Sequence, residues 1–323
     1  MSDFSSLFDD VAEEMQLVEE QLLCCVNSKL DVINGAYRQL IEAGGKRLRP
    51  AFTLLTAKMY GEDINHVIPL AVALEIVHMA TLVHDDVIDN SYIRRGKPTV
   101  KSTWGNRFSI YSGNHMFARS LAIIAAYERH DLIHIIAEAS MIICEGEMIQ
   151  MAGCYDVKLG LKNYWRRIER KTALLISLSC LLGAKLCNLS YARENIHKRF
   201  GYYLGMAYQI IDDILDFVAD ESVLGKPSGG DIRQGVITLP AIYALRHSEH
   251  KSELAMWLSS PQTCLDRADD IIELVLDSGG IDYAYEIAQA FYGRAQRQLD
   301  KLPDSQVKRS FGSIAEYVLS REY

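Results

Sequence analysis

The chain has 323 residues, 49% of them hydrophobic and 24% charged, a composition that can fill a large core and differs from that of a disordered chain. Lys and Arg number 34 against 42 Asp and Glu, and the net charge of −8 argues against a protein that binds nucleic acid through basic residues. The seven cysteines include no C-x-x-C pair, so we expect reduced thiols in a cytoplasmic protein. We expect neither a signal peptide nor a membrane-spanning helix, because the N-terminal segment is acidic and the longest uncharged apolar run, residues 172–184, is too short.

Long helices are predicted for most of the chain. No proline occurs between Pro98 and Pro227, and strand signals are weak. No linker rich in Pro, Gly or Ser divides the sequence, so we expect residues 1–323 to form one all-α domain, a large helical bundle. The predicted helices cover residues 5–26, 29–42, 47–59, 66–89, 106–127, 130–152, 162–186, 191–218, 235–247, 265–276, 280–300 and 305–319.

Residues 224–240 interrupt this pattern with four glycines and two prolines. Glycine at this density predicts either a plain connection between helices or a mobile flap over a binding site. Taken alone, the composition favours the plain connection.

The sequence D-D-x-x-D occurs twice, each time near the end of a predicted helix. Asp85 and Asp89 form an i,i+4 pair in the first copy, and Asp212 and Asp216 form one in the second. Like charges at this spacing and at this end of a helix are destabilising, and the apolar neighbours argue against a solvated acidic face. Oxygen ligands suit Mg²⁺, and neither copy has the spacing of an EF-hand. The two copies therefore predict a magnesium site made by these four carboxylates.

Cations for a phosphate-bearing substrate are present in three short basic groups. The first lies in G-G-K-R-L-R-P, where backbone amides at a helix start also favour anions. An ordinary basic helix start is the alternative, although basic residues oppose the helix dipole there. His78, two helical turns before Asp85, either packs in the core or donates to the same phosphate. The basic candidates are Lys46, Arg49, Arg94, Arg95 and Lys171.

In order and spacing, five segments resemble the motifs of the trans-prenyltransferases, the E-polyprenyl diphosphate synthases. They are GGKRLRP, LVHDDVIDN with RRGKPT, RKTALL, YQIIDDILDF and LGKPSGGD, and they cover roughly residues 40–240. The closer likeness, through VHMATLVHDDVID and RRIERKTALLI, is to component 2 of the heteromeric heptaprenyl and hexaprenyl diphosphate synthases of Gram-positive bacteria.

The resemblance implies an isoprenoid-synthase type of all-α fold, with the two acidic motifs facing each other across a central cavity, and it makes residues 224–240 a closing flap. The implied ligands of Mg²⁺ are Asp85, Asp89, Asp212 and Asp216. The residues implied to contact the allylic diphosphate are Arg94, Lys171 and Lys226, and those implied to bind isopentenyl diphosphate are Lys46, Arg49, His78 and Arg95. Thr172 and Gln209 would turn their oxygens toward the allylic carbon. The implied catalytic set is Asp85, Asp89, Lys171, Thr172, Gln209 and Asp212.

The implied reaction is the successive head-to-tail condensation of isopentenyl diphosphate onto an allylic diphosphate such as farnesyl diphosphate. If Asp85 holds the diphosphate, the growing tail runs back along its helix past Thr81, Ala80 and Val77, at about 5 Å per turn. Short-chain members of the family carry a bulky aromatic residue at the positions of Ala80 or Thr81, whereas small residues leave the passage open. An ordinary small core residue is the alternative for Ala80. We therefore expect a product of about C30 to C35, heptaprenyl diphosphate for menaquinone side chains.

The resemblance also implies partners, namely a second copy of the chain, a small non-catalytic component 1 subunit, or both. Two alternatives stay open: a shorter-chain, geranylgeranyl-producing homodimer, and a non-catalytic regulatory subunit. Such subunits lose their aspartates, whereas both triplets are present here. A terpene cyclase would carry an Asn/Ser/Glu pattern in place of the second triplet, and a head-to-head synthase would lack GGKRLRP.

Overall fold

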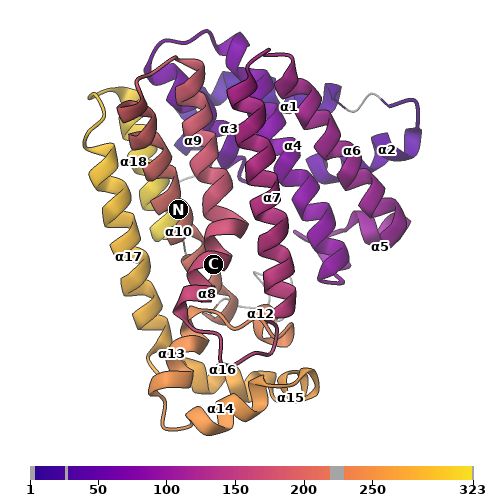
Figure 1. Ribbon diagram of the computed structural model, residues 1–323, viewed down its shortest axis with the longest axis vertical. Helices are drawn as coiled ribbons and strands as arrows, with labels where there is room; N and C mark the ends of the chain where they lie inside the picture. The colour runs from indigo at the N-terminus through magenta and orange to yellow at the C-terminus, as the bar shows by residue number, and fades with distance from the viewer. Residues whose placement is uncertain (1–3, 26–27, 219–228, 322–323) are drawn as a thin grey trace. The chain divides into compact units, whose positions relative to one another are not determined.

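The computed structural model describes residues 4–25, 28–218 and 229–321, and nearly all of these lie in helices (Figure 1). The exceptions in regular structure are two short strands, β1 (Ile93–Arg94) and β2 (Lys97–Pro98), which pair antiparallel. The predicted all-α class is confirmed. No disulfide links any of the seven cysteines, all of which lie among the described residues.

The helices follow one another along the whole chain. They are η1 (Phe4–Val11), α1 (Ala12–Cys24), α2 (Asp31–Glu42), α3 (Leu48–Met59), α4 (Ile64–Ile88), α5 (Val100–Trp104), α6 (Asn106–Ala125), α7 (His130–Ala152), α8 (Leu161–Ile168), η2 (Glu169–Ala173), α9 (Leu174–Leu186), α10 (Tyr191–Val218), α12 (Gly230–Arg233), α13 (Leu239–His247), α14 (Lys251–Leu258), α15 (Pro261–Asp266), α16 (Ala268–Asp277), α17 (Gly280–Leu299) and α18 (Gln306–Leu319).

Most predicted helices are present with their ends shifted by a few residues. The predicted helix 162–186 is found as α8, η2 and α9, with η2 wound as a single π-helical turn. The predicted helix 5–26 begins as a 3₁₀ turn, and the predicted helix 265–276 is divided between α15 and α16. The short helices α5 and α14 and the β1–β2 hairpin were not predicted, because elements of two to eight residues are too short to show a periodic pattern.

The described residues form two compact units, each assembled from stretches far apart in sequence. Unit 1 contains Met1–Glu138, Leu175–Lys198 and Lys301–Ser313. Unit 2 contains Ala139–Leu174, Arg199–Asp300 and Ile314–Tyr323. A single domain over the whole chain therefore remains a prediction.

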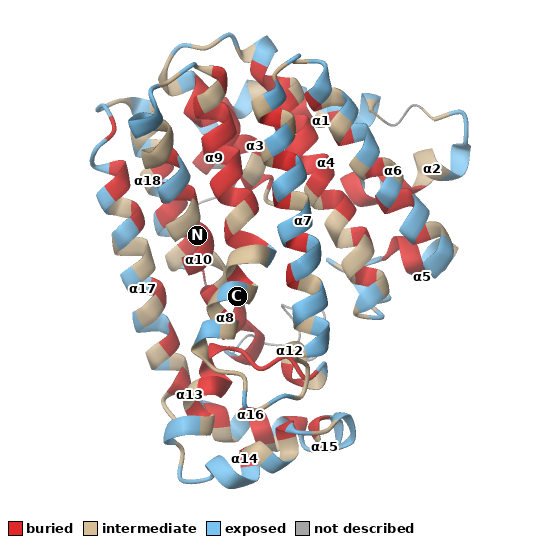
Figure 2. Cartoon of the chain, viewed as in Figure 1, coloured by how far each residue is buried: buried red, intermediate tan, exposed pale blue. Residues whose placement is uncertain are grey.

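The core of unit 1 is formed around α4, which packs against α3 and α6. Figure 2 shows most of α3, α4 and α9 as buried. Within the described residues α4 alone is long and apolar enough to span a membrane, and 72% of its most apolar 18-residue window is buried. The side chain of Asp63 caps the first turn of α4 by accepting from the Asn65 N–H, and Pro69 lies one turn further on.

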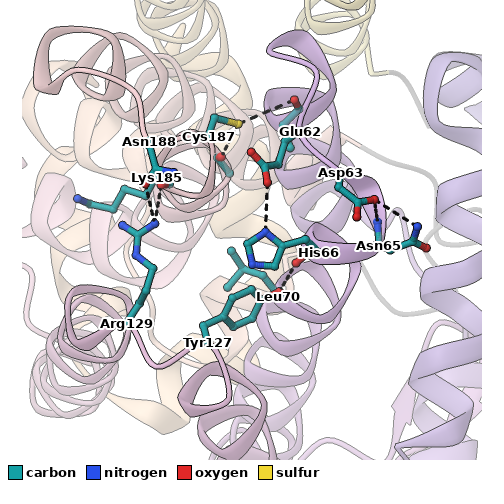
Figure 3. Close-up of polar contacts among 12 residues, drawn as sticks. Glu62, Asp63, Asn65, His66, Leu70, Tyr127, Arg129, Lys185, Cys187 and Asn188 are labelled. Atoms are coloured by element: carbon teal, nitrogen blue, oxygen red, sulfur yellow. Dashed lines mark hydrogen bonds and ion pairs between the residues drawn. The ribbon is translucent and has the colours of Figure 1, made fainter.

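A tyrosine hydroxyl enters the hydrogen-bond ladder of α4 near the start of the helix (Figure 3). The Tyr127 hydroxyl accepts from the Leu70 N–H at 3.0 Å and donates to the His66 carbonyl at 2.5 Å. Leu70 and His66 are the i and i−4 residues that an undisturbed helix bonds directly. A side chain inserted into the hydrogen-bond ladder is one of the known local disturbances of a helix. It ties the end of α6 to the start of α4.

Unit 2 has a core of its own, in which α8, η2, α10, α13, α16 and α17 take part. The Trp165 and Phe291 rings lie 5.7 Å apart between α8 and α17. The backbone of Gly205 approaches that of Ala173 so closely that a Cβ at Gly205 would lie 2.6 Å from the Ala173 Cα. This close approach brings η2 and α10 together and places the side chains of both within hydrogen-bonding reach.

Candidate active site

In unit 1, the first acidic motif lies at the end of α4, and its three carboxylates have different surroundings. Asp85 and Asp89 are partly exposed, and Asp89 is the C-cap residue of the helix. Asp86 is 1% exposed and accepts from Nε of Arg94 at 2.9 Å. Burial raises the pKa of Asp86, and the Arg94 guanidinium opposes that shift. The outer aspartates are therefore accessible, and the middle one holds an arginine.

The basic run before α3 also contains both buried and accessible side chains. Arg47 is 7% exposed, with its Nη1 2.9 Å from Glu75 Oε1 and its Nε 2.5 Å from Glu19 Oε1. It adopts φ 46°, a left-handed conformation that is costly for a residue with a side chain. The two ion pairs hold it in this conformation. Lys46 and Arg49, on either side, are partly exposed.

The two basic runs of unit 1 meet around His78. The pKa of His78 lies well below its usual value because of burial and the guanidinium groups of Arg49, Arg95 and Arg94, in that order. A Cβ at Gly45 would lie 2.5 Å from Nη1 of Arg95, so this guanidinium lies directly against the glycine turn. The structure thus brings together residues that the sequence places in three separate segments, and it makes His78 a neutral imidazole at neutral pH.

In unit 2, the second acidic motif lies in the last turns of α10, and its three carboxylates again differ in exposure and in their partners. Asp212 Oδ1 lies 2.6 Å from Nη1 of Arg321, whose side chain is 3% exposed against 33% for Asp212. Asp213 is 2% exposed, and burial raises its pKa to about 6. Asp216 is 6% exposed and accepts from the backbone N–H of Asp231 at 2.8 Å. Asp212 is therefore the most accessible carboxylate of this motif.

Thr172 and Gln209 are bonded to each other. Thr172 Oγ1 lies 2.5 Å from Gln209 Oε1, and Gln209 Nε2 lies 2.8 Å from Asp213 Oδ1. Thr172 and the exposed Lys171 lie in the π-helical turn η2, an irregularity that often marks functional sites in helices.

Three residues near the second motif, Tyr164, Asp231 and Arg321, were not found by sequence reasoning. Tyr164 donates to Asp213, and Arg321 pairs with Asp212. Arg167, which belongs to the third basic group of the sequence, acts electrostatically on Asp213. The pKa of Asp231 is raised to about 7, first by burial and then by Asp216 and Asp213. Only Asp231, the last residue of the G-G-D run, carried a signal in the sequence, since it ends one of the five motifs.

The residues proposed for chain length lie along α4, where Val77 and Ala80 are each 2% exposed. The Thr81 hydroxyl donates to the His78 carbonyl at 2.8 Å. Lys226 falls outside the described residues, together with the rest of the stretch 224–228 that begins the glycine-rich segment.

The sequence of the chain is similar to those of known proteins along most of its length. The polyprenyl synthetase family profile matches residues 30–275. The chain belongs to the polyprenyl synthetase family. It is 40% identical to heptaprenyl diphosphate synthase component 2 of Bacillus subtilis over 99% of this chain and 91% of that protein. It is 31% identical to octaprenyl diphosphate synthase of Haemophilus influenzae over 96% of this chain and 94% of that protein.

Solved structures of the family share its fold. Heptaprenyl diphosphate synthase from Staphylococcus aureus superposes with a TM-score of 0.90 at 34% identity, covering 96% of this chain and 98% of that one. A polyprenyl synthase from Caulobacter crescentus, complexed with calcium and isoprenyl diphosphate, gives a TM-score of 0.90 at 31% identity, covering 99% and 98%. The isoprenoid-synthase type of all-α fold, expected from the motifs, is thereby confirmed.

The donor set of the acidic motifs suits a cation that the substrate helps to bind. Among the residues that the structure describes, no group of three or more His, Cys, Asp or Glu side chains could hold a metal ion by itself. In unit 1 the partly exposed Asp85 and Asp89, and in unit 2 the partly exposed Asp212, nevertheless offer the carboxylate oxygens that Mg²⁺ prefers. Because Mg²⁺ is commonly bound by one or two carboxylates together with water and substrate phosphates, each motif taken by itself fits the ion without a closed protein cage.

Proposed function

We propose that this polyprenyl synthetase is a long-chain all-trans-polyprenyl diphosphate synthase that condenses isopentenyl diphosphate onto an allylic diphosphate, with farnesyl diphosphate as the primer. The observation that carries the proposal is the basic cluster of unit 1, in which the Arg95 guanidinium lies against the glycine turn at Gly45 and the charges of Arg49, Arg95 and Arg94 lower the pKa of His78. Together with the accessible Asp85 and Asp89 on the same helix, α4, this cluster suits a diphosphate and its counter-ion.

The proposed ligands of Mg²⁺ are Asp85, Asp89 and Asp212, with Asp216 as a fourth from its place in the motif. When bound, Mg²⁺ would neutralise the charge that develops on the diphosphate leaving group.

The chain's own residues would bind and orient the two substrates. Arg94, held by Asp86, would contact the allylic diphosphate together with Lys171 and Lys226. The residues proposed for isopentenyl diphosphate are Lys46, Arg49, His78 and Arg95. A neutral His78 would donate one N–H to a phosphate oxygen without adding charge to the cluster.

Carbon–carbon bond formation would then need an environment that tolerates an allylic cation. The oxygens of Thr172 and Gln209 are proposed to face that cation. No side-chain nucleophile is required, and the departing pyrophosphate would take the proton that the new chain loses. Apolar walls would exclude water, which would otherwise quench the cation.

We further propose a heptaprenyl product of about C30 to C35, since Ala80 and Thr81 are small residues at the positions where short-chain members of the family carry a bulky aromatic residue. The proposed role is the supply of menaquinone side chains in the cytoplasm. The 40% identity to a component 2 supports a heteromer with a small non-catalytic component 1, alone or in addition to a homodimer. A geranylgeranyl-producing homodimer remains the second candidate, because a geranylgeranyl diphosphate synthase of Methanosarcina mazei is 33% identical over 89% of this chain.

The decisive experiment incubates the purified chain with farnesyl diphosphate, isopentenyl diphosphate and Mg²⁺, with and without a component 1 subunit, and sizes the products. We expect weak activity of the chain alone and a heptaprenyl product with the partner. Full activity of the chain alone would contradict the heteromer, and a product of four isoprene units would favour the second candidate. Absence of turnover in both arms would contradict the catalytic assignment.

A further inference from the structure

Four side chains of unit 2 form one continuous hydrogen-bonded series. The Tyr164 hydroxyl lies 2.8 Å from Asp213 Oδ2, and Gln209 Nε2 lies 2.8 Å from Asp213 Oδ1. At the other end of this series, Thr172 Oγ1 lies 2.5 Å from Gln209 Oε1. Tyr164 and Asp213 are each 2% exposed and Thr172 is 7% exposed, so water competes little for these bonds.

The Asp213 carboxylate fixes the direction of every hydrogen bond in this series. An ionised carboxylate only accepts hydrogen bonds, so the Tyr164 hydroxyl and the Gln209 amide nitrogen must both donate to Asp213. The oxygen of the amide is thereby turned toward Thr172. Because an amide oxygen cannot donate, the single proton of the Thr172 hydroxyl is used in the bond to Gln209. Thr172 therefore has only oxygen lone pairs left to offer a substrate, and Gln209 keeps a second lone pair on the oxygen that faces Thr172.

We propose that Asp213 and Tyr164 are positioning residues for prenyl transfer, which orient the Gln209 amide and, through it, the Thr172 hydroxyl. The inference rests on the function proposed above, in which an allylic cation forms beside Thr172 and Gln209. Lone pairs directed at a developing positive charge stabilise it, whereas an N–H or O–H dipole directed at it does the opposite. Asp213, the middle residue of its motif, therefore acts through Gln209 and not as a ligand of the metal.

An isosteric substitution separates this role from simple packing. In Asp213→Asn, the Tyr164 hydroxyl continues to donate, so it holds the amide oxygen of the new side chain on its own side. The new NH₂ then faces Gln209, which must flip, and the Thr172 proton is released toward the substrate. Removing the tyrosine hydroxyl as well, in Asp213→Asn with Tyr164→Phe, frees the asparagine to turn its oxygen back to Gln209. The second substitution should therefore rescue the first.

The test measures kcat and both KM values in mildly alkaline buffer, with the component 1 subunit present. We expect Asp213→Asn to lower kcat by about tenfold or more with KM values within about twofold, and the added Tyr164→Phe to recover at least about threefold. Tyr243→Phe, which removes a hydroxyl from a ring stacked on Tyr283, is the matched control and should rescue nothing. A double variant no faster than Asp213→Asn overturns the inference, as does a loss confined to KM.

A second readout is independent of turnover. The side-chain amide resonance of ¹⁵N-labelled Gln209 reports which of its atoms faces residue 213. It should shift in Asp213→Asn and return toward the wild-type position in the double variant. An unshifted resonance in both variants overturns the inference even if the wild-type chain is fully active. An inactive wild-type chain that shows the expected shifts would contradict the proposed function and leave the hydrogen-bond directions supported.

Discussion

Arg94 donates from Nε to Oδ1 of Asp86 at 2.9 Å, although the two residues belong to different predicted functional groups. The carboxylate is 1% exposed and the arginine side chain 30% exposed. The acidic motif therefore positions one of the cations proposed to bind the substrate, and it does so with the aspartate that the metal would not need. Fixing the guanidinium in advance lowers the entropic cost of binding a phosphate.

Removing this carboxylate should destabilise the fold and weaken substrate binding together. We expect Asp86→Leu to lower the free energy of unfolding by about 1–3 kcal/mol, because it leaves the partly buried guanidinium of Arg94 without its partner. Urea unfolding measures this change. In the double variant with Arg94→Gln, the loss should be smaller than the sum of the single losses. Arg129 and Asp131, a pair whose carboxylate is 41% exposed, serve as the control and should contribute less than about 1 kcal/mol.

Asp85→Asn should abolish most turnover and leave the fold intact. Asp85 is partly exposed and belongs to an i,i+4 pair of like charges, so its loss removes a repulsion from α4. We expect kcat to fall by roughly a hundredfold or more and thermal stability to stay the same or rise slightly. Asp277→Asn, at the end of α16, is the matched control. Wild-type turnover of Asp85→Asn at saturating Mg²⁺ would remove Asp85 from the proposed site.

Ala80→Phe should shorten the product. Ala80 is 2% exposed on α4, so a phenyl ring there must occupy space close to the proposed path of the growing tail. We expect the first condensation to survive and elongation to stop early, at a cost in stability of about 1–3 kcal/mol from overpacking. Ala80→Ser is the control, and chromatographic sizing of the products is the measurement. An unshortened product ladder from a folded Ala80→Phe variant would mean that the tail does not pass this residue.

Stability at acid pH should depend on a buried histidine in unit 1. His197 is fully buried, its Nε2 lies 3.0 Å from the Tyr60 hydroxyl, and burial lowers its pKa to about 4. The unfolded chain has a pKa of about 6.5 at this residue, so it binds the proton more readily than the folded chain does. The stabilisation is therefore complete above about pH 6.5 and is lost as the pH falls toward 4, by about 3 kcal/mol in total.

Urea unfolding at several pH values would check this expectation. The decline in stability between these two pH values should be shallower in His197→Phe than in the wild-type chain, even though the variant loses the bond to Tyr60. His134→Gln, at an exposed position, should leave the pH profile unchanged. If the free energy of unfolding falls equally steeply with pH in His197→Phe and in the wild-type chain, His197 does not govern the loss of stability at acid pH.

The sequence by itself determined the helical class, the approximate ends of the long helices and the position of both acidic motifs on them. These follow from local signals, since helix periodicity and the absence of proline act over a few turns. It also carried enough ordered motifs to indicate the family. Local sequence patterns did not predict the short helices α5, α12 and α14 or the π-helical turn η2, which depend on packing.

The tertiary structure supplies the physical reason why some members of each charged run are accessible and others are buried. The sequence presents Lys46, Arg47 and Arg49 as equivalent cations, but Glu19 and Glu75 bury the middle one. Likewise, Asp213 differs from Asp212 because Tyr164, 49 residues away in sequence, reaches it. Accessibility and hydrogen-bond direction depend on partners brought close by folding, and no spacing within a motif contains that information.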